Sequence, residues 1–155
     1  MNEKWHQNEN NQSFNEKDIA IMRGEICPYC GAKPELIDSA EIYNGTSYGP
    51  IYICRPCNAY VGVYENTNKP LGRLANAGLR ELKKQAHEVF DKIWRLKYKR
   101  GRHQAYYWLS KQLKLPFDYT HIGMMDEDYC RKTIIICKQY LYQKDPEQFP
   151  EYKDT

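Results

Sequence analysis

The amino-acid sequence predicts an α+β fold in which a small antiparallel sheet, organised by cysteine pairs, packs against about three α-helices. Residues 24–66 carry two Cys-x-x-Cys pairs among short β-branched and aromatic runs, which are typical of strands. After Pro70, apolar residues recur at spacings of three and four, as they do along one face of a helix. We therefore expect a strand-forming half followed by a helical half.

Composition divides the chain into four segments, because its two ends are polar and its middle carries the apolar patterns. We expect a mostly disordered arm (1–22), a strand-forming region with the cysteine pairs (23–68), a helical region packed on it (69–142) and a loose tail (143–155). A helical turn is expected near residues 16–22. Trp5 and Phe14 are candidates to hold the arm to the body of the protein.

Short runs of β-branched and aromatic residues predict the strands. The expected strand pieces are residues 35–37, 41–43, 51–53 and 60–64. The sequence Asn44-Gly45-Thr46-Ser47 is a turn signal between the second and third pieces.

Three helices are expected after Pro70. The apolar stripe of the first consists of Leu79, Leu82, Ala86, Val89, Ile93 and Leu96. Asn76 is the expected N-cap of this first helix, and Asp126 is that of the third, which runs through Leu141. The second is expected over residues 102–114. We expect these helices to share a core of Trp94, Trp108, Leu109, Tyr129 and Ile134.

The cysteine pairs Cys27/Cys30 and Cys54/Cys57 predict one metal site. Two residues between the cysteines allow a tight turn to direct both sulfurs to one point, and two such turns complete the tetrahedron that zinc prefers. Gly31 and Asn58, the residues that best tolerate positive φ, follow the pairs in equivalent positions. The alternative, four free or buried cysteines, does not explain this repeated pattern. A site of four thiolates has no open coordination position, so we expect one structural Zn²⁺ and a zinc ribbon.

Cys130 and Cys137 are seven residues apart on the expected third helix, so they lie on one face. Buried helical thiols behave as small hydrophobic residues, and we expect both to pack in the core. The alternative is a second metal or redox site.

The middle of the chain is basic. Residues 92–117 contain eight Lys or Arg and no Asp or Glu. Interleaved aromatic residues make this region a candidate to contact phosphates and stack on bases. The candidate nucleic-acid-binding residues are Arg55, Lys92, Arg95, Lys97, Lys99, Arg100 and Arg102. The alternative is a solvated linker between two helices.

No catalytic residue is nominated, because the sequence shows neither paired carboxylates at useful spacing nor a Gly-rich phosphate loop. His87 and His121 have two interpretations. Each either acts in a cleft together with a carboxylate, or caps or bridges helices.

Several motifs besides the cysteine pairs carry a resemblance. They are Ala59-Tyr60-Val61-Gly62, Pro70-Leu71-Gly72-Arg73-Leu74-Ala75-Asn76, Ala86-His87 with Phe90-Asp91, and His121-Ile122-Gly123-Met124. Together with the first cysteine turn, they resemble the bacterial and phage "zinc-finger-containing domain" family of unknown function, over residues 25–140. The resemblance implies a four-cysteine ribbon fused to a helical part, and an origin in a bacterium, a prophage or another mobile element. It implies no activity.

The sequence therefore favours a non-enzymatic zinc-ribbon protein that binds DNA or RNA. The alternative is a protein–protein interaction module or inhibitor, acting on a host or defence protein through a tyrosine-rich surface. No stretch has the length and apolar character of a signal peptide or a membrane span, so we expect a cytoplasmic protein of a bacterial or phage-infected cell, with no membrane partner.

Overall fold

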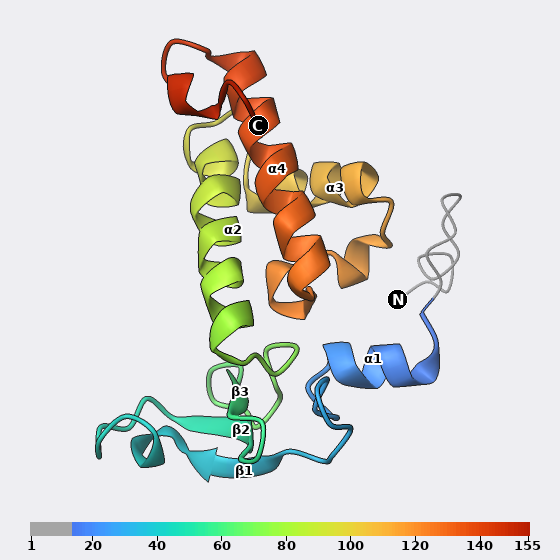
Figure 1. Cartoon of the computed structure of the whole chain (residues 1–155), viewed down its shortest axis with the longest axis vertical. Coiled ribbons are helices and arrows are strands. Elements are labelled where there is room, and N and C mark those ends of the chain that lie inside the picture. The colour runs from blue at the N-terminus through green and yellow to red at the C-terminus, as the bar shows by residue number, and fades with distance from the viewer. Residues whose placement is uncertain (1–13) are drawn as a thin grey trace. The chain divides into compact units, whose positions relative to one another are not determined.

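A computed structural model describes residues 14–155, which form two compact units. We call residues 14–80 the sheet unit and residues 81–155 the helical unit. The prediction of an α+β fold with an antiparallel sheet is confirmed (Figure 1). Most of the expected N-terminal arm, including the anchoring role of Trp5, lies outside the described residues.

The sheet unit begins with helix α1 (Glu16–Met22), at the place where a helical turn was expected. The side chain of Asn15 accepts a hydrogen bond from the Asp18 amide at 2.8 Å, and the Asp18 carboxylate accepts one from the Asn15 amide at 3.3 Å. This reciprocal pair of hydrogen bonds satisfies two amides that the first turn of a helix leaves free.

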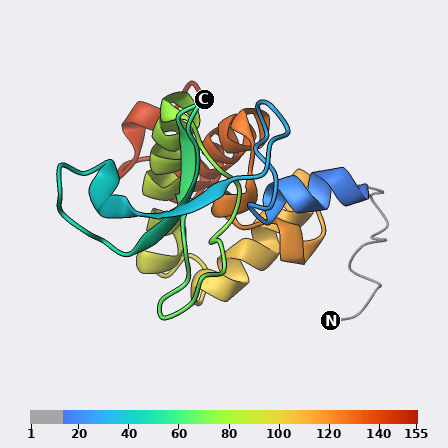
Figure 2. The same cartoon turned by 90° about the horizontal axis from the view of Figure 1, so that it is seen from below.

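Three strands follow, in the order β1 (Glu35–Asp38), β2 (Pro50–Cys54) and β3 (Ala59–Gly62), and both neighbouring pairs are antiparallel. Viewed from below, the loop of residues 42–49 extends away from the strands (Figure 2). The prediction of a further strand at 41–43 is wrong, because the 3₁₀ helix η2 (Ser39–Glu41) starts directly after β1.

The side chain of Asp38 explains this difference. It accepts a hydrogen bond from the Ala40 amide at 2.8 Å, and Asp38 is the N-cap of η2. An aspartate that captures the amide two residues ahead competes with strand pairing and favours a turn.

The core of the sheet unit contains a cluster built around two cysteines. The buried members of this cluster are Cys27, Cys54, Ala59 and Leu74. Ile51 and Ile53 of β2 are buried as well. The chain returns to β3 through two isolated bridges, Tyr60–Ala75 and Val63–Pro70, and Leu74 lies next to the first of them. Two of the four residues of the cluster are thus cysteines of the candidate metal site.

The backbone of residues 70–72 passes close to Gly24. The φ of Gly24 is +75°, and a Cβ atom there would lie 2.5 Å from the Gly72 carbonyl oxygen and 2.7 Å from Cβ of Pro70. Backbone atoms cannot yield as the end of a flexible side chain does, so an added methyl group forces the two segments apart.

We expect Gly24→Ala to lower the free energy of unfolding of the sheet unit by about 2 kcal/mol, from the left-handed backbone and the clash together. Gly45→Ala is the matched control, because Gly45 has a φ of +87° but open space around it. It should cost about 1 kcal/mol. Denaturant unfolding measures both, and equal losses would contradict the close approach at Gly24.

The helical unit is built from three long helices and three short ones. They are α2 (Ala77–Arg95), α3 (Arg102–Leu113), η3 (Phe117–Tyr119), η4 (Ile122–Met124), α4 (Glu127–Lys144) and η5 (Pro150–Tyr152), and α2 begins within the sheet unit. The two expected N-caps are present. Oδ1 of Asn76 accepts from the Leu79 amide at 3.0 Å, and Oδ1 of Asp126 accepts from the Tyr129 amide at 2.9 Å.

The core of the helical unit differs from the expected one. Its fully buried large residues include Phe90, Ile93, Leu109, Ile122 and Leu141, each with 0% exposure. Of the five residues expected to share a core, Leu109 alone is fully buried, and the other four are partly exposed.

The two tryptophans show why. The indole N–H of Trp94 donates a hydrogen bond to Asp91 at 3.0 Å, and the ring of Trp108 lies 4.6 Å from that of Tyr140. Large aromatic rings with a polar group settle at the edge of a core, where one end stays close to water.

The C-terminal segment, expected to be loose from residue 143, has an ordered anchor. Phe149 is buried, and its ring stacks on that of Tyr152 at 5.6 Å. The hydroxyl oxygen of Tyr152 accepts a hydrogen bond from Nζ of Lys92 at 2.8 Å. One buried aromatic residue and its neighbours thus hold this polar segment against α2.

Among residues 14–155, no helix combines the length and the apolar character that crossing a membrane requires.

Candidate functional site

The four cysteines of the sheet unit meet at one point. Cys27 and Cys30 lie in the turn before β1, Cys54 ends β2, and Cys57 lies in the turn that leads to β3. Their sulfur atoms all lie within 4.8 Å of one another, and those of Cys30 and Cys54 are 3.5 Å apart. Zinc–thiolate bonds of about 2.3 Å place tetrahedral sulfurs about 3.8 Å apart, so the cluster fits one such ion.

The backbone of both cysteine turns has the conformation that the sequence predicts. Gly31 has a φ of +80° and Asn58 a φ of +49°. The Gly31 amide donates to the Cys27 carbonyl at 2.9 Å, and the Tyr29 amide points to the Cys27 sulfur at 3.4 Å. Turns of this kind direct amide N–H groups at sulfur, which stabilises a thiolate.

The thiols differ in how readily they ionise. A hydrogen bond from the backbone of Ala32, followed by those from Cys54 and Cys57, lowers the pKa of Cys30. The hydrogen bond to Cys30, together with burial, raises the pKa of Cys57 to about 12, and burial raises the pKa of Cys54. Without a metal, Cys30 is therefore easier to deprotonate than Cys54 and Cys57, and binding a dication releases the protons that these thiols carry.

Within the described part of the chain, these cysteines are the one group of His, Cys, Asp or Glu whose ligand atoms gather closely enough to share an ion. Cys130 and Cys137 are fully buried in the helical unit. Burial raises the pKa of Cys137, so its thiol stays protonated and chemically inert.

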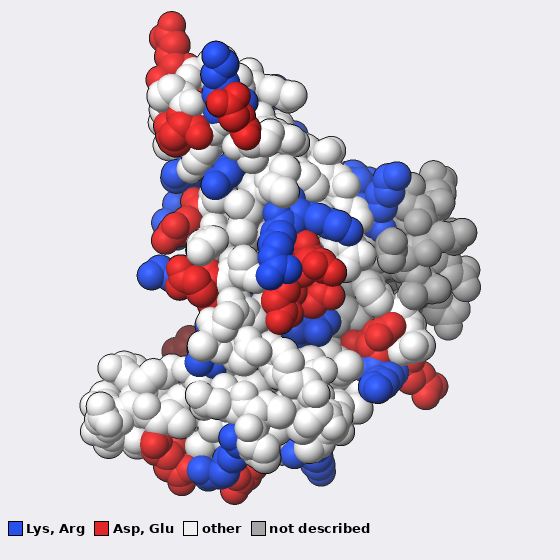
Figure 3. Space-filling view, viewed as in Figure 1, with Lys and Arg blue, Asp and Glu red and all other residues white. Residues whose placement is uncertain are grey.

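The candidate nucleic-acid-binding residues fall into three groups. The largest lies at the turn between α2 and α3, where Arg95 ends one helix and Arg102 begins the next. The side chains of Arg95, Lys97, Arg100 and Arg102 are exposed there. Figure 3 shows Lys and Arg of the helical unit interspersed with Asp and Glu on the face in view.

Lys99 belongs to the same turn but lies against aromatic rings. Its Nζ is 5.7 Å from the ring centre of Trp108 and 5.4 Å from that of Tyr140. Nζ of Lys144 lies 5.4 Å from the same Tyr140 ring, so this lysine joins the turn from α4. Sequence reasoning missed Lys144, because nothing in the local pattern shows that α4 ends beside residue 99.

Lys92 faces elsewhere. Its Nζ donates to Tyr152 and lies 6.0 Å from the ring centre of Phe149. It therefore helps to anchor the C-terminal segment, although it remains partly exposed.

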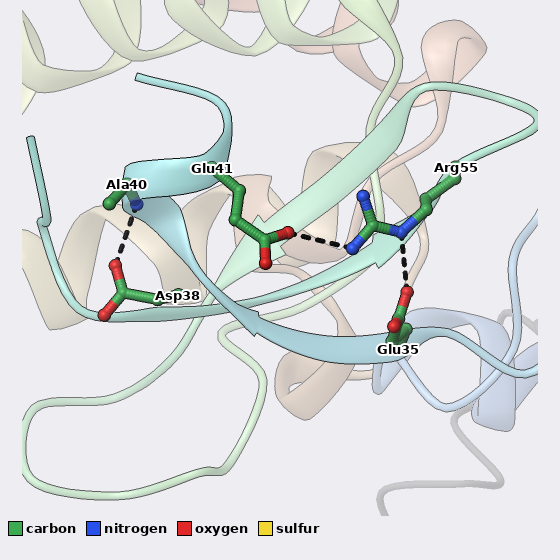
Figure 4. A network of polar contacts seen from close by, with 5 residues as sticks. All are labelled: Glu35, Asp38, Ala40, Glu41 and Arg55. Atoms are coloured by element: carbon green, nitrogen blue, oxygen red, sulfur yellow. Dashed lines mark hydrogen bonds and ion pairs between the residues drawn. The ribbon is translucent and has the colours of Figure 1, made fainter. Parts of the chain in front are cut away.

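Arg55, in the sheet unit, is held by two carboxylates (Figure 4). Its Nε lies 2.7 Å from Glu35, and an Nη atom lies 2.8 Å from Glu41. The hydrogen bonds to these two residues raise the pKa of Arg55, and they engage Nε and one Nη of its guanidinium.

The two histidines are partly exposed. Nδ1 of His87 lies 3.9 Å from Oδ1 of Asp91, and the side chain borders a groove of about 990 Å³. The imidazole of His121 packs against the ring of Tyr106 at 4.7 Å. Both therefore have neighbours that suit a binding site as well as a structural role.

A family model described as a zinc-finger-containing domain matches residues 23–140. No curated protein and no solved structure gives a significant match. The matched range contains all four clustered cysteines and all the basic residues of the α2–α3 turn, so one family pattern spans residues from both units.

Proposed function

The chain belongs to the zinc-finger-containing domain family, and from this premise we propose that it is a non-enzymatic zinc-ribbon protein that binds DNA or RNA. The binding surface is the group of cations at the α2–α3 turn. We call it the basic surface and define it as Arg95, Lys97, Lys99, Arg100, Arg102 and Lys144.

The cysteine cluster has a structural role in this proposal. Cys27, Cys30, Cys54 and Cys57 hold one Zn²⁺ as thiolates, in a tetrahedral arrangement that their sulfur separations support. Four protein ligands leave no position for water or substrate, so the ion supplies folding free energy and no catalysis. A reducing bacterial cytoplasm suits such a site, because thiols must stay reduced to bind the metal.

One observation carries the nucleic-acid proposal: most of the cations at this turn are exposed and sit together with aromatic rings. Trp108 and Tyr140 lie beneath Lys99, and Arg95 lies 5.1 Å from the ring centre of Trp94. Cations beside accessible rings provide phosphate contacts and stacking partners together. Lys92 and Arg55 are left out of the surface, because Tyr152 in one case and two glutamates in the other engage their charged groups.

Fluorescence anisotropy with labelled single-stranded DNA, duplex DNA and RNA of about 20 nucleotides tests the proposal. Six contacts predict that the logarithm of the binding constant falls with the logarithm of salt with a slope of about −4 to −5. If none of the three probes binds at about 50 mM salt, nucleic-acid binding is not the function.

A hollow in the sheet unit supports a second candidate, binding of a host or defence protein. It has a volume of about 560 Å³, and Tyr48 and Tyr64, which are 75% and 44% exposed, line it. Glu65 is the one charged residue among its lining residues. Much of the visible face of the sheet unit is likewise uncharged in Figure 3. Exposed aromatic rings on a weakly charged surface are typical of protein interfaces.

Tyr48→Ala tests this candidate in a pull-down from nuclease-treated host lysate. A stoichiometric partner that is lost with Tyr48→Ala but kept with Tyr107→Ala, an exposed tyrosine of the helical unit, would support it. A partner that survives both substitutions does not use the hollow.

A further inference from the structure

Three segments of the helical unit bring four hydrogen-bonding side chains towards one another. His87 comes from α2, Arg102 and Tyr106 from α3, and His121 from the residue before η4. The guanidinium carbon of Arg102 lies 5.7 Å from the ring centre of Tyr106, whose ring is 4.7 Å from the imidazole of His121. The charge of Arg102 acts on both imidazoles. Residues distant in sequence thus converge around one guanidinium.

Most of these groups can still donate a hydrogen bond. The hydroxyl of Tyr106 accepts one from the Ile122 amide at 3.4 Å, which leaves its own proton available. Arg102 makes no ion pair with any described residue. A cluster of hydrogen-bond donors around one cation suits an anion that accepts several hydrogen bonds.

Carboxylates stand beside both imidazoles. Oδ1 of Asp91 lies 3.9 Å from Nδ1 of His87 and accepts a hydrogen bond from the Trp94 indole. Asp118 acts electrostatically on His121, and its buried Oδ2 has no hydrogen-bond partner among the described residues. Each imidazole therefore has an acidic neighbour that stabilises its protonated form.

We propose that Arg102, His87 and His121 bind one phosphate group. The proposal deepens the proposed function and rests on it for the source of that group, the backbone of a bound nucleic acid. Phosphate matches the site because its charge suits Arg102 and its oxygens accept bonds from guanidinium and imidazole N–H groups. A metal ion does not match, because Arg102 would repel it and because, among the described residues, ligand atoms gather for a metal at the cysteines alone.

Binding at this site takes up protons. Desolvation, and then the charges of Arg102 and Lys83, lower the pKa of His87 against the opposing effect of Asp91. Desolvation, Arg102 and His103 likewise lower the pKa of His121, and Asp118 opposes them. Both imidazoles are thus neutral at pH 7 when the site is free, and a bound phosphate raises both pKa values.

The sign of the pH dependence follows. Affinity is highest where both imidazoles are protonated and falls as pH rises from the free-state pKa, below the usual value of about 6.5, through the higher bound-state pKa. The lysines and arginines of the basic surface keep their charge over this range. A loss of affinity as the pH rises through this range therefore distinguishes the phosphate site from the rest of that surface.

The first arm of the test uses inorganic phosphate and the full, zinc-loaded chain. Imidazole nitrogen resonances are followed by NMR up to about 50 mM phosphate at pH 6.5. We expect the chemical shifts of His87 and His121 to change until the site is saturated. Arg102→Gln should weaken phosphate binding at least about tenfold. Arg131→Gln is the matched control, being an exposed arginine of α4 outside the basic surface, and should leave phosphate binding unchanged. If neither signal moves in the native chain, the site is overturned.

The second arm uses a short oligonucleotide and separates the two proposals. We expect its affinity to fall about tenfold from pH 6 to 8, and this fall to disappear with Arg102→Gln but not with Arg131→Gln. Oligonucleotide binding that is independent of pH and equal in both variants overturns the phosphate site and leaves the proposed function standing. Phosphate binding without oligonucleotide binding supports the phosphate site and contradicts the proposed function. It assigns the site to a small phosphate-bearing ligand.

Discussion

Removal of the zinc ion is expected to unfold the sheet unit. Its strands are four or five residues long, its buried apolar residues outside the turns are few, and two of the four residues of its buried cluster, Cys27 and Cys54, are themselves zinc ligands. So small a core cannot offset the chain entropy lost on folding. Zinc binding by four thiolates contributes about 10 kcal/mol or more, which makes it the largest single stabilising contribution in this unit.

Chelation followed by NMR measures the result. We expect amide signals of residues 35–62 to collapse to the narrow range of an unfolded chain, and to return when one equivalent of zinc is added back. The metal content should be one ion per chain. Retention of dispersed strand signals in the metal-free protein would show that the apolar core suffices by itself.

A pair of cysteine substitutions provides the matched control. Cys54→Ser removes a ligand that is also a buried core residue, and should abolish stoichiometric zinc binding along with the fold of the sheet unit. Cys137→Ala removes an equally buried thiol from the helical unit, should cost about 1 kcal/mol and should leave the zinc content at one. If both variants lose zinc, metal binding depends on more than the four clustered sulfurs.

Structural features that depend on a few neighbouring residues could be predicted from the sequence. The N-caps at Asn76 and Asp126 are examples, because a cap is decided by one side chain and the amide three residues ahead. The positive φ of Gly31 and Asn58 is another, since few other residues tolerate it. The spacing of the cysteines belongs here too, because two tight turns determine where four sulfurs point.

Features that depend on contacts between distant residues could not be predicted. Phe149 looks like part of a polar tail until its partner Tyr152 and the side chain of Lys92 are in place. The tryptophans look like core residues until their polar neighbours are known. The proximity of His87, Arg102 and His121 likewise depends on how α2, α3 and the segment before η4 pack. No local sequence pattern predicts this packing.

The sequence could not rank the candidate nucleic-acid-binding cations. It gave equal weight to all seven Lys and Arg candidates, because a cation with a partner and one without look the same in a sequence. Arg55 has Glu35 and Glu41 as partners, whereas Arg100 is exposed at a turn and makes no ion pair among the described residues. Which cations are available to a ligand is thus a property of the fold.

Removing cations from the α2–α3 turn is expected to have the second-largest effect, which is a loss of nucleic-acid affinity. The triple variant Lys97→Gln, Lys99→Gln and Arg100→Gln removes three cations of the basic surface and keeps the length of their side chains roughly constant. Because each phosphate contact releases condensed counterions, losing three should lower nucleic-acid affinity by about two to three orders of magnitude at about 50 mM salt. The salt dependence should become shallower by about 2 to 3 units of slope.

The control must remove the same net charge elsewhere. Arg55→Gln, Arg131→Gln and Lys132→Gln do so at positions outside the basic surface, where Arg55 and Arg131 have carboxylate partners and Lys132 lies 5.0 Å from the ring centre of Tyr129. If nucleic acid binds at the turn, this second triple variant should keep nearly all its affinity and its salt slope. Equal losses in the two variants would mean that binding follows the net charge of the protein and that the turn is not a site. Anisotropy titrations at three salt concentrations decide between these outcomes, because a local site changes the slope by the number of contacts removed.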